Sequence, residues 1–401
     1  MILHKYSTTP AKIIIIESLE GGDIMIYRDF RDMKLSALGL GTMRLPVIDG
    51  DDAKIDEKAA AELIDYAMEQ GINYYDTAWG YHNGNSELVV GRALKKHPRE
   101  KFYLASKFPG YDLSNMDKVK EIFEKQLEKC QVEYFDFYLF HNVCEMNIDD
   151  YLDEKHGIYD YLMEQKKNGR IRHLGFSAHG GLEVMKRFLE KYGKDKEFCQ
   201  LQINYLDWKF QQAKEKVELL KEYDIPVWVM EPLRGGKLAV VGEEYEKELK
   251  GLRPEEGVPA WAFRFLQSLP EVKVILSGMS NMEQLKDNIH TFEEDHPLNE
   301  KEMETILHIA DRMLEKNTVP CTACHYCTSH CPQELDIPEL LKLYNEHNFT
   351  GGGFIAPMVL GGYPEDKRPG ACVGCRSCEA VCPQQIKISE VMSDFAGKLA
   401  L

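Results

Sequence analysis

Eight of the 11 cysteines in this 401-residue sequence fall into two short runs near its C-terminal end. Both runs have the spacing Cys-x2-Cys-x2-Cys-x3-Cys-Pro. Three thiolates at this spacing can wrap around one corner of a 4Fe-4S cubane, while the fourth is directed away by the turn at the proline. The repeated spacing therefore predicts two 4Fe-4S clusters, with the candidate ligands Cys321, Cys324, Cys327, Cys331, Cys372, Cys375, Cys378 and Cys382.

The double run resembles that of two-cluster ferredoxins, in which the fourth cysteine of each run binds the other cluster. The resemblance implies one cluster on Cys321, Cys324, Cys327 and Cys382, and a second on Cys372, Cys375, Cys378 and Cys331. Structural zinc and disulfides are weaker interpretations, because zinc usually takes paired Cys-x2-Cys knuckles and disulfides require an oxidising compartment. The 40 residues between the runs include a helical pattern at 337–344, so we expect a mainly α-helical ferredoxin-like domain.

A second group of reactive residues lies nearer the start of the chain. Asp76-Thr77-Ala78 is followed by Tyr81, and then by Ser86-Glu87 and Gly91-Arg92-Ala93-Leu94. These segments, with 104–107, 136–141 and 175–177, are similar to the aldo-keto reductase family over about residues 25–291. The resemblance implies a four-part active site, an NAD or NADP cofactor, and a small carbonyl or alcohol substrate. The implied catalytic residues are Asp76, Tyr81, Lys107 and His141.

Their chemistry agrees with this assignment. Asp76, Lys107 and His141 each stand at the C-terminal end of a predicted strand, and Tyr81 lies in the loop beyond Asp76, which is where barrel enzymes build active sites. A tyrosine hydroxyl can protonate a carbonyl oxygen when an ammonium group stabilises its phenolate and a carboxylate holds that ammonium. His141 would orient the carbonyl and assist the proton transfer. Each residue alone has an ordinary structural explanation, so the prediction rests on their joint spacing.

The same resemblance implies the cofactor-binding residues. Ser177 and Gln202 would hold the carboxamide of the nicotinamide, and Met230 stands where the family usually has a stacking tyrosine. No Arg or Lys directly follows the eighth strand to hold a 2′-phosphate, although Lys286 is near, so the choice between NADP and NAD stays open. The remaining candidates are Thr42, Gly278, Ser280 and Asn288.

Strands and helices that could position these residues alternate along most of the chain. Strand patterns occur at 35–41, 73–78, 102–107, 135–141, 173–177, 200–204, 227–231 and 273–277, with amphipathic helices between them at 57–69, 87–95, 118–130, 159–168, 182–192, 211–223 and 260–269, and another at 282–289 after the last. Eight such units predict an α/β fold of the (β/α)8 TIM-barrel type. No strand opens a Gly-x-Gly-x-x-Gly turn, which argues against a Rossmann fold.

The expected domains are a barrel at 25–298, a connecting helix at 299–316 and the iron-sulfur domain at 317–401. Residues 1–24 read as an N-terminal extension of different character. The segment Glu20-Gly21-Gly22-Asp23 can be encoded by a ribosome-binding sequence ahead of Met25, so we hypothesise that translation starts at Met25.

Composition excludes several classes of function. The chain has 66 acidic and 49 basic residues, a net charge of -17, which argues against nucleic acid as a partner. The longest aliphatic run, residues 13–16, is too short for a membrane span or a signal peptide. We therefore expect a cytoplasmic protein, with Cys130, Cys144 and Cys199 as unreactive core thiols.

Three functions fit these patterns. The first is an NAD(P)-dependent oxidoreductase that moves a hydride to or from a carbonyl or alcohol. The second is an electron-transfer protein, in which the clusters pass the two electrons of a hydride to a redox protein partner. In the third, the clusters only stabilise the small C-terminal domain against the barrel.

Overall fold

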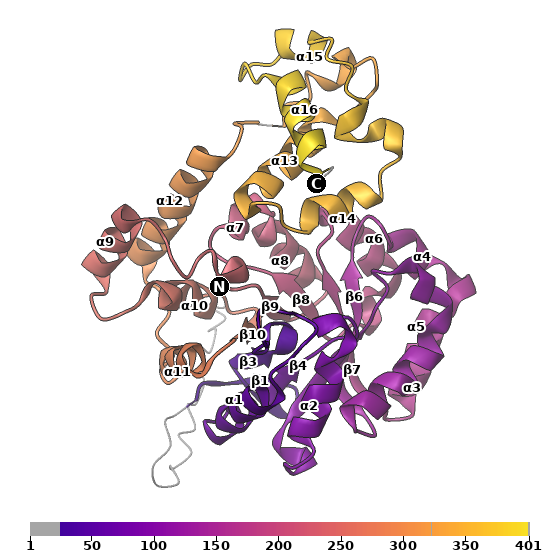
Figure 1. Ribbon diagram of the computed structural model, residues 1–401, viewed down its shortest axis with the longest axis vertical. Helices are drawn as coiled ribbons and strands as arrows, with labels where there is room; N and C mark the ends of the chain where they lie inside the picture. Colours follow the sequence, from indigo (N-terminus) through magenta and orange to yellow (C-terminus); the bar gives the residue numbers. More distant parts are fainter. Residues whose placement is uncertain (1–24, 322, 400–401) are drawn as a thin grey trace, which may run out of the picture.

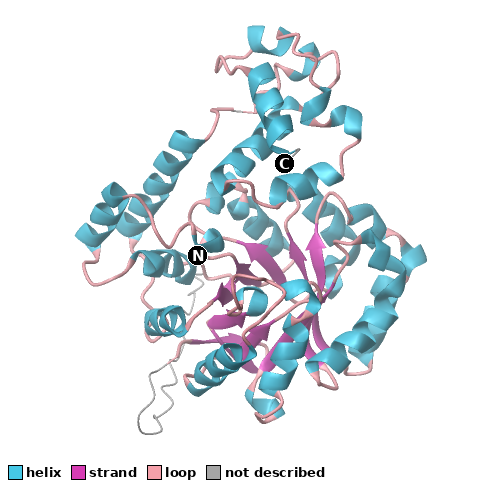
Figure 2. Cartoon of the chain, viewed as in Figure 1, coloured by secondary structure: helices cyan, strands magenta, loops and turns pink. Residues whose placement is uncertain are grey.

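The computed structural model describes residues 25–321 and 323–399, and its centre is a closed barrel of eight parallel strands (Figures 1 and 2). The neighbours around the barrel follow chain order, and the last strand pairs with the first. The predicted TIM barrel is therefore confirmed. Its strands are β3 (Leu38–Gly41), β4 (Tyr74–Asp76), β5 (Tyr103–Phe108), β6 (Phe135–Val143), β7 (Ile171–Ala178), β8 (Cys199–Gln202), β9 (Val227–Met230) and β10 (Val272–Gly278).

Amphipathic helices surround the strands and bury their apolar stripes against them. In α1, for example, Leu63 and Ile64 are buried, and the Asp56 side chain caps the first turn by accepting from the Ala59 amide. The barrel helices are α1 (Glu57–Glu69), α2 (Ser86–Leu94), α3 (Val119–Cys130), α4 (Ile148–Leu152), α5 (Ile158–Lys167), α6 (Leu182–Tyr192), α7 (Asp207–Phe210), α8 (Ala213–Glu222), α9 (Glu243–Leu252), α10 (Val258–Gln267) and α11 (Met282–Thr291).

A hairpin of β1 (Tyr27–Phe30) and β2 (Met33–Ser36) precedes the barrel. The expected single strand at 35–41 is thus wrong at its start, because the chain leaves the hairpin at Ser36 and begins β3 at Leu38. Phe30 and Leu35 of the hairpin belong to an apolar cluster with Phe137 and Trp228 of the barrel strands. The hairpin therefore covers one end of the barrel interior.

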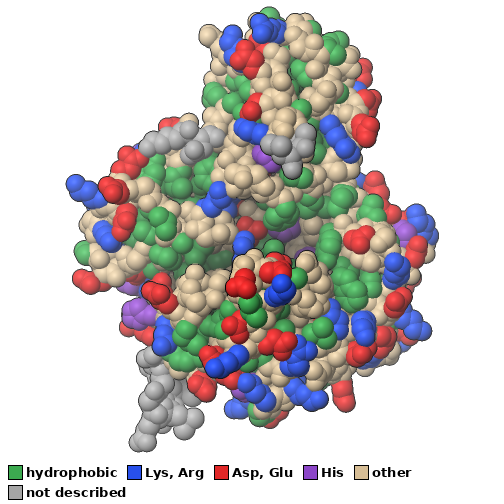
Figure 3. Space-filling view, viewed as in Figure 1, with side chains coloured by type: hydrophobic (Ala, Val, Ile, Leu, Met, Phe, Trp, Pro, Cys, Tyr) green, Lys and Arg blue, Asp and Glu red, His purple; other side chains and the backbone are tan. Residues whose placement is uncertain are grey.

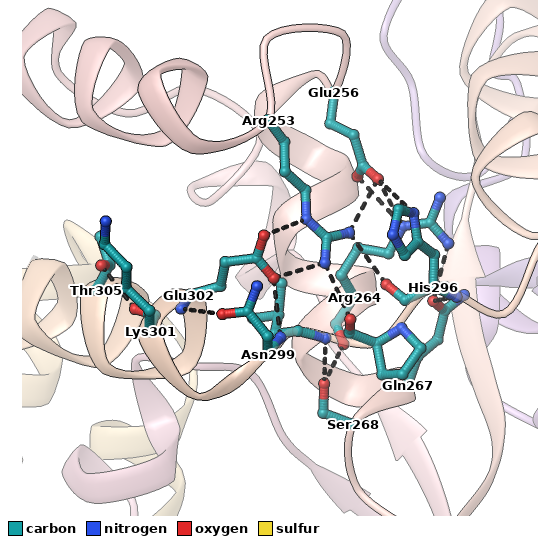
Figure 4. A network of polar contacts seen from close by, with 12 residues as sticks. Arg253, Glu256, Arg264, Gln267, Ser268, His296, Asn299, Lys301, Glu302 and Thr305 are labelled. Carbon is teal, nitrogen blue, oxygen red and sulfur yellow. Dashed lines mark hydrogen bonds and ion pairs between the residues drawn. The ribbon is translucent and has the colours of Figure 1, made fainter.

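Helix α12 (Glu300–Asn317) leaves the barrel and is fastened to it by a polar network (Figure 4). Arg253 donates to both carboxylate oxygens of Glu302, at 2.9 and 2.6 Å. Glu302 also completes a capping box with Asn299 at the start of the helix. Glu256 accepts from both Arg253 and Arg264, so α9, α10 and α12 are joined at one point.

The C-terminal segment is helical, as expected, and consists of α13 (Ile337–Thr350), α14 (Ile355–Gly361), α15 (Ser377–Ala380) and α16 (Ile388–Leu399). It has its own apolar core, in which Leu340, Val359 and Phe395 pack with Cys327 and Cys378 of the two cysteine runs. Helices α13 and α14 lie next to the barrel, whereas α15 lies at the far end of the domain (Figure 1).

Two further expectations concern the start of the chain and the three cysteines outside the two runs. The proposed extension at 1–24 lies outside the described residues. Cys130, Cys144 and Cys199 are buried, as predicted, and burial raises the pKa of each of these thiols. Across the described chain, we find no helix with the length and apolar character needed to cross a membrane.

Candidate functional site

The Lys107 ammonium is the centre of a buried polar group at the C-terminal ends of β4 and β5. Its Nζ donates to Asp76 Oδ2 at 2.6 Å, to the Thr77 carbonyl at 2.8 Å and to the Tyr81 hydroxyl at 3.3 Å. Lys107 is completely buried and Asp76 is 2% exposed. The alternation along β5 directs Lys107 into the barrel, while the loop after β4 returns Tyr81 above it.

Electrostatics favour a charged lysine beside a protonated tyrosine. Burial opposes the Lys107 charge, but the Asp76 carboxylate outweighs it and raises the pKa of Lys107. Burial also raises the pKa of Tyr81, and the Lys107 ammonium opposes this rise. Tyr81 is therefore a neutral donor at physiological pH, with an ammonium in place to stabilise the phenolate left after proton transfer.

His141 on β6 faces the same group. Its ring meets Tyr81 edge-on with centroids 6.1 Å apart, and Tyr111 meets it from another side at 5.1 Å. Burial, with the positive charge of Lys107, holds the pKa of His141 well below its usual value, so the imidazole is neutral. Within the described chain its Nδ1 is buried without a hydrogen-bond partner. The structure thus brings all four predicted catalytic residues together.

The predicted cofactor residues lie at the same end of the barrel, and several are already hydrogen-bonded within the protein. Ser177 Oγ accepts from the Asn142 amide at 2.8 Å, and Gln202 Nε2 donates to Asp207 at 2.9 Å. Met230 is the last residue of β9. Thr42 is buried, with its hydroxyl 2.9 Å from Ser86 Oγ, and Asn288 Nδ2 donates to Ser277 Oγ at 3.1 Å.

One cation at this end was missed by the sequence reasoning. Arg44 extends from the loop after β3 past the end of β10, where a Cβ on Gly278 would lie 2.8 Å from Arg44 Cγ. A Cβ on Gly235, after β9, would lie 3.5 Å from Arg44 Nη2, and Ser280 Oγ donates to the Arg44 carbonyl at 2.9 Å. Arg44 is exposed and makes no ion pair among residues 25–321 and 323–399. Lys286 instead holds its ammonium 5.4 Å from the Tyr66 ring centroid.

The eight cysteines of the C-terminal domain line two separate cavities. One is lined by Cys321, Cys324, Cys327 and Cys382, and the other by Cys331, Cys372, Cys375 and Cys378. The cavities enclose about 310 and 330 Å³ including their open mouths. In each, three cysteines come from one run and the fourth from the other run. Elsewhere their walls are mainly apolar, for example Leu341 and Ile386 in the first.

Four thiols around a cavity fit a cubane better than a single ion. In the described residues, no three His, Cys, Asp or Glu side chains are arranged to ligate one metal ion. Cysteines that bind a cubane each ligate a different iron, so they stand further apart than the ligands of one ion. The donor chemistry and the cavities therefore fit the predicted clusters.

Comparisons with known proteins agree with both halves of the chain. Residues 37–311 match the aldo/keto reductase family model, and residues 320–387 match a 4Fe-4S dicluster domain model. The NADH-specific methylglyoxal reductase of Escherichia coli is 26% identical over 304 residues, covering 64% of this chain and 90% of that protein.

Solved structures give the same result for the barrel. The holo form of an aldo-keto reductase from Bacillus halodurans aligns with a TM-score of 0.59 and 27% identity, covering 71% of this chain and 96% of that one. An aldo-keto reductase from Klebsiella pneumoniae in complex with NADPH has the same fold, with a TM-score of 0.57, 17% identity, and coverage of 71% and 96%. The chain described here belongs to the aldo/keto reductase family and carries a C-terminal 4Fe-4S dicluster domain.

Proposed function

We propose that this protein is an NAD(P)-dependent oxidoreductase that interconverts a small carbonyl compound and its alcohol. The observation that carries the proposal is the position of Lys107 Nζ, 2.6 Å from Asp76 Oδ2 and 3.3 Å from the Tyr81 hydroxyl. This arrangement pairs a proton donor with the charge that stabilises its conjugate base, in a site from which water is largely excluded.

In reduction, Tyr81 donates its proton to the carbonyl oxygen, and Lys107 stabilises the phenolate while Asp76 keeps Lys107 charged and in place. Neutral His141 donates a hydrogen bond that orients the carbonyl. A bound nicotinamide supplies the hydride in this direction and accepts it in the other. Ser177 and Gln202 would hold its carboxamide, Met230 would pack on its ring, and the remaining contacts would come from Thr42, Gly278, Ser280 and Asn288.

Arg44 extends this proposal to the choice of cofactor. Its guanidinium lies near the loops that follow β9 and β10. Within the described chain no carboxylate is within ion-pair distance of it, although its charge acts on the buried Glu231 carboxyl. A fork of N–H donors at such a position suits a phosphate group. We therefore assign Arg44 to the 2′-phosphate of NADP, the role that sequence analysis considered for Lys286.

The C-terminal domain would hold two 4Fe-4S clusters. Cys321, Cys324, Cys327 and Cys382 would ligate the first, and Cys331, Cys372, Cys375 and Cys378 the second, as the two cavities suggest. We take 25–298 as the barrel, 299–316 as the connecting helix and 317–401 as this domain. Thiolate-bound clusters also suit the reducing cytoplasm.

A second candidate function is electron transfer, and the exposure of Cys324 and Cys375 favours it. Because each cavity has one ligand at the surface, a redox protein could approach either cluster closely. Two clusters together accept the two electrons of one hydride, and the proton is released to solvent. Anaerobic protein mixed with NADH or NADPH should then show reduced clusters by EPR. Intact carbonyl reduction without a cluster signal would leave the clusters a structural role.

The carbonyl chemistry is tested by Tyr81→Phe, with Tyr111→Phe as the matched control. Tyr111 also contacts the His141 ring, but its hydroxyl makes no hydrogen bond to Lys107 among the described contacts. Loss of the proton donor should lower kcat for carbonyl reduction by about 10²- to 10⁴-fold, with the cofactor Kd unchanged. Undiminished turnover by Tyr81→Phe would remove Tyr81 from the mechanism.

A further inference from the structure

Helix α14 of the C-terminal domain presents two different faces. Ile355, Ala356, Val359 and Leu360 are buried in the core of their own domain. Phe354, directly before the helix, and Met358, four residues later, share another face, because residues four apart lie one above the other. This second face is directed toward the barrel.

Both residues of that face contact side chains beside the catalytic site. The Phe354 ring meets the ring of His179, just beyond β7, edge-on with centroids 5.3 Å apart. Asn142 Nδ2, on the residue after His141, lies 3.1 Å from Met358 Sδ. Two neighbouring barrel strands therefore end against α14, and one of them carries a catalytic residue.

Phe354 remains 48% exposed despite its contact with His179. It is one of few large apolar side chains of the described chain with so much open surface, and it lies beside the barrel mouth. The surface is hollowed where the C-terminal domain meets the barrel, and histidine side chains are visible in that hollow (Figure 3). An open aromatic face at such a place suits an apolar group of a ligand.

The position of α14 is fixed by contacts made through α13. Arg234 Nη2 lies 2.5 Å from Glu346 Oε2, and Lys237 Nζ donates to the Phe349 carbonyl at 3.3 Å. A wall held in this way selects substrates better than a mobile loop, because a ligand need not order it on binding.

We infer that Phe354 and Met358 form an apolar wall of the substrate site, so that the iron-sulfur domain determines which carbonyl compounds the barrel accepts. The inference rests on the proposed oxidoreductase function and extends it. The substrate class is a carbonyl compound whose carbon skeleton continues past His141 toward α14 as an apolar, aromatic or branched group. Met358 can adapt to its shape because its side chain is unbranched and flexible.

Propanal and 3-phenylpropanal test this inference, because they differ by one terminal phenyl group. For Phe354→Ala, kcat/KM for 3-phenylpropanal should fall about tenfold, since apolar contact area is lost, and that for propanal should fall much less, so the ratio of the two values should drop. Phe354→Tyr keeps the ring and should retain most of the preference. Pro357→Ala is the matched control, because Pro357 is exposed on the same helix and none of the described ring contacts or hydrogen bonds joins its side chain to the barrel.

Iron content and visible absorbance show whether each variant keeps its clusters. A ratio of the two kcat/KM values that is unchanged in Phe354→Ala, with full iron content, would overturn this inference alone. A parent enzyme that reduces neither aldehyde would overturn the proposed function and this inference with it. Equal losses for both aldehydes would make Phe354 a structural residue and also contradict the inference.

Discussion

Arg234 of the barrel and Glu346 of α13 form a buried ion pair, with side chains that are each only 2% exposed. Arg234 also donates to Asp207 at 3.0 Å, and its guanidinium lies 4.9 Å from the Phe349 ring centroid. The pair joins the loop after β9, the strand that ends in Met230, to the helix between the two cysteine runs.

Breaking this pair should destabilise the docked arrangement of the two domains. Glu346→Ala leaves part of the Arg234 charge uncompensated, so we expect a loss of about 3 kcal/mol and a lower Tm. Glu339→Ala is the control on the same helix, because Glu339 pairs with Lys342 near the surface and should cost less than about 1 kcal/mol. Thermal unfolding followed by circular dichroism gives the stability loss of each variant. Equal losses would mean that the buried pair stabilises the protein no more than the surface pair.

The pH dependence should differ between the two directions of the reaction. Reduction needs protonated Tyr81, whose pKa burial raises above 10, so loss of the Tyr81 proton should not lower kcat for reduction below about pH 9. Oxidation needs the phenolate and should accelerate with pH over the same range. Because the pKa of His141 is well below its usual value, His141 should add no step near about pH 6.5. Burial raises the pKa of Glu231, whose charge acts on Tyr81, to about 7, so a step from this carboxyl is expected there. A step in stopped-flow rates that persists in Glu231→Gln would contradict a neutral His141.

Arg44 should discriminate between the two nicotinamide cofactors. Removing its charge in Arg44→Gln should raise KM for NADPH by about tenfold or more and leave KM for NADH nearly unchanged, because only NADPH carries the 2′-phosphate. Lys286→Gln serves as the control, since the Lys286 ammonium lies over Tyr66 instead. Steady-state kinetics with NADPH and NADH give the two KM values for each variant. A rise in KM for NADPH alone in Lys286→Gln, and not in Arg44→Gln, would assign the 2′-phosphate to Lys286 instead.

Iron counts in double variants can test the crossed ligand sets. Cys331→Ser with Cys375→Ser removes two ligands from one cavity, so iron should fall from about eight to about four atoms per chain. Cys331→Ser with Cys324→Ser removes one ligand from each cavity and should affect both clusters. If each run held its own cluster, the two results would be exchanged. Cys130→Ala, outside both runs, should keep full iron content.

Much of the barrel could be predicted from sequence because its strands are buried on both faces and separated by amphipathic helices. The hairpin β1–β2 could not, because its strands have four residues each and turn at Arg31 in a left-handed conformation, φ 55°, without glycine. Helix α14 was not predicted either, because it has only seven residues and glycine clusters at 351–353 and 361–362 flank it.

The candidate site also has a part that the sequence predicts and a part that only the folded structure shows. Asp76 and Tyr81 are close in sequence, and Lys107 and His141 end neighbouring strands, so their convergence follows from the barrel. Arg44 and Ser280 are 236 residues apart, and they meet only because the last strand closes on the first. The positions of Phe354 and Met358 beside the barrel depend on how the C-terminal domain packs against it. No periodicity in the sequence predicts that packing.

The β1–β2 hairpin at the other end of the barrel limits how molecules can reach the active site. Phe30 and Leu35 pack against Phe137 and Trp228 in the filled barrel interior and close that end, so the catalytic residues are approached from the opposite end. In the proposed function, substrate and product would pass at that end, where α14 contacts His179 and Asn142. A bound nicotinamide would be exchanged at this same end, which is bordered both by the loops of the barrel and by α14 of the C-terminal domain.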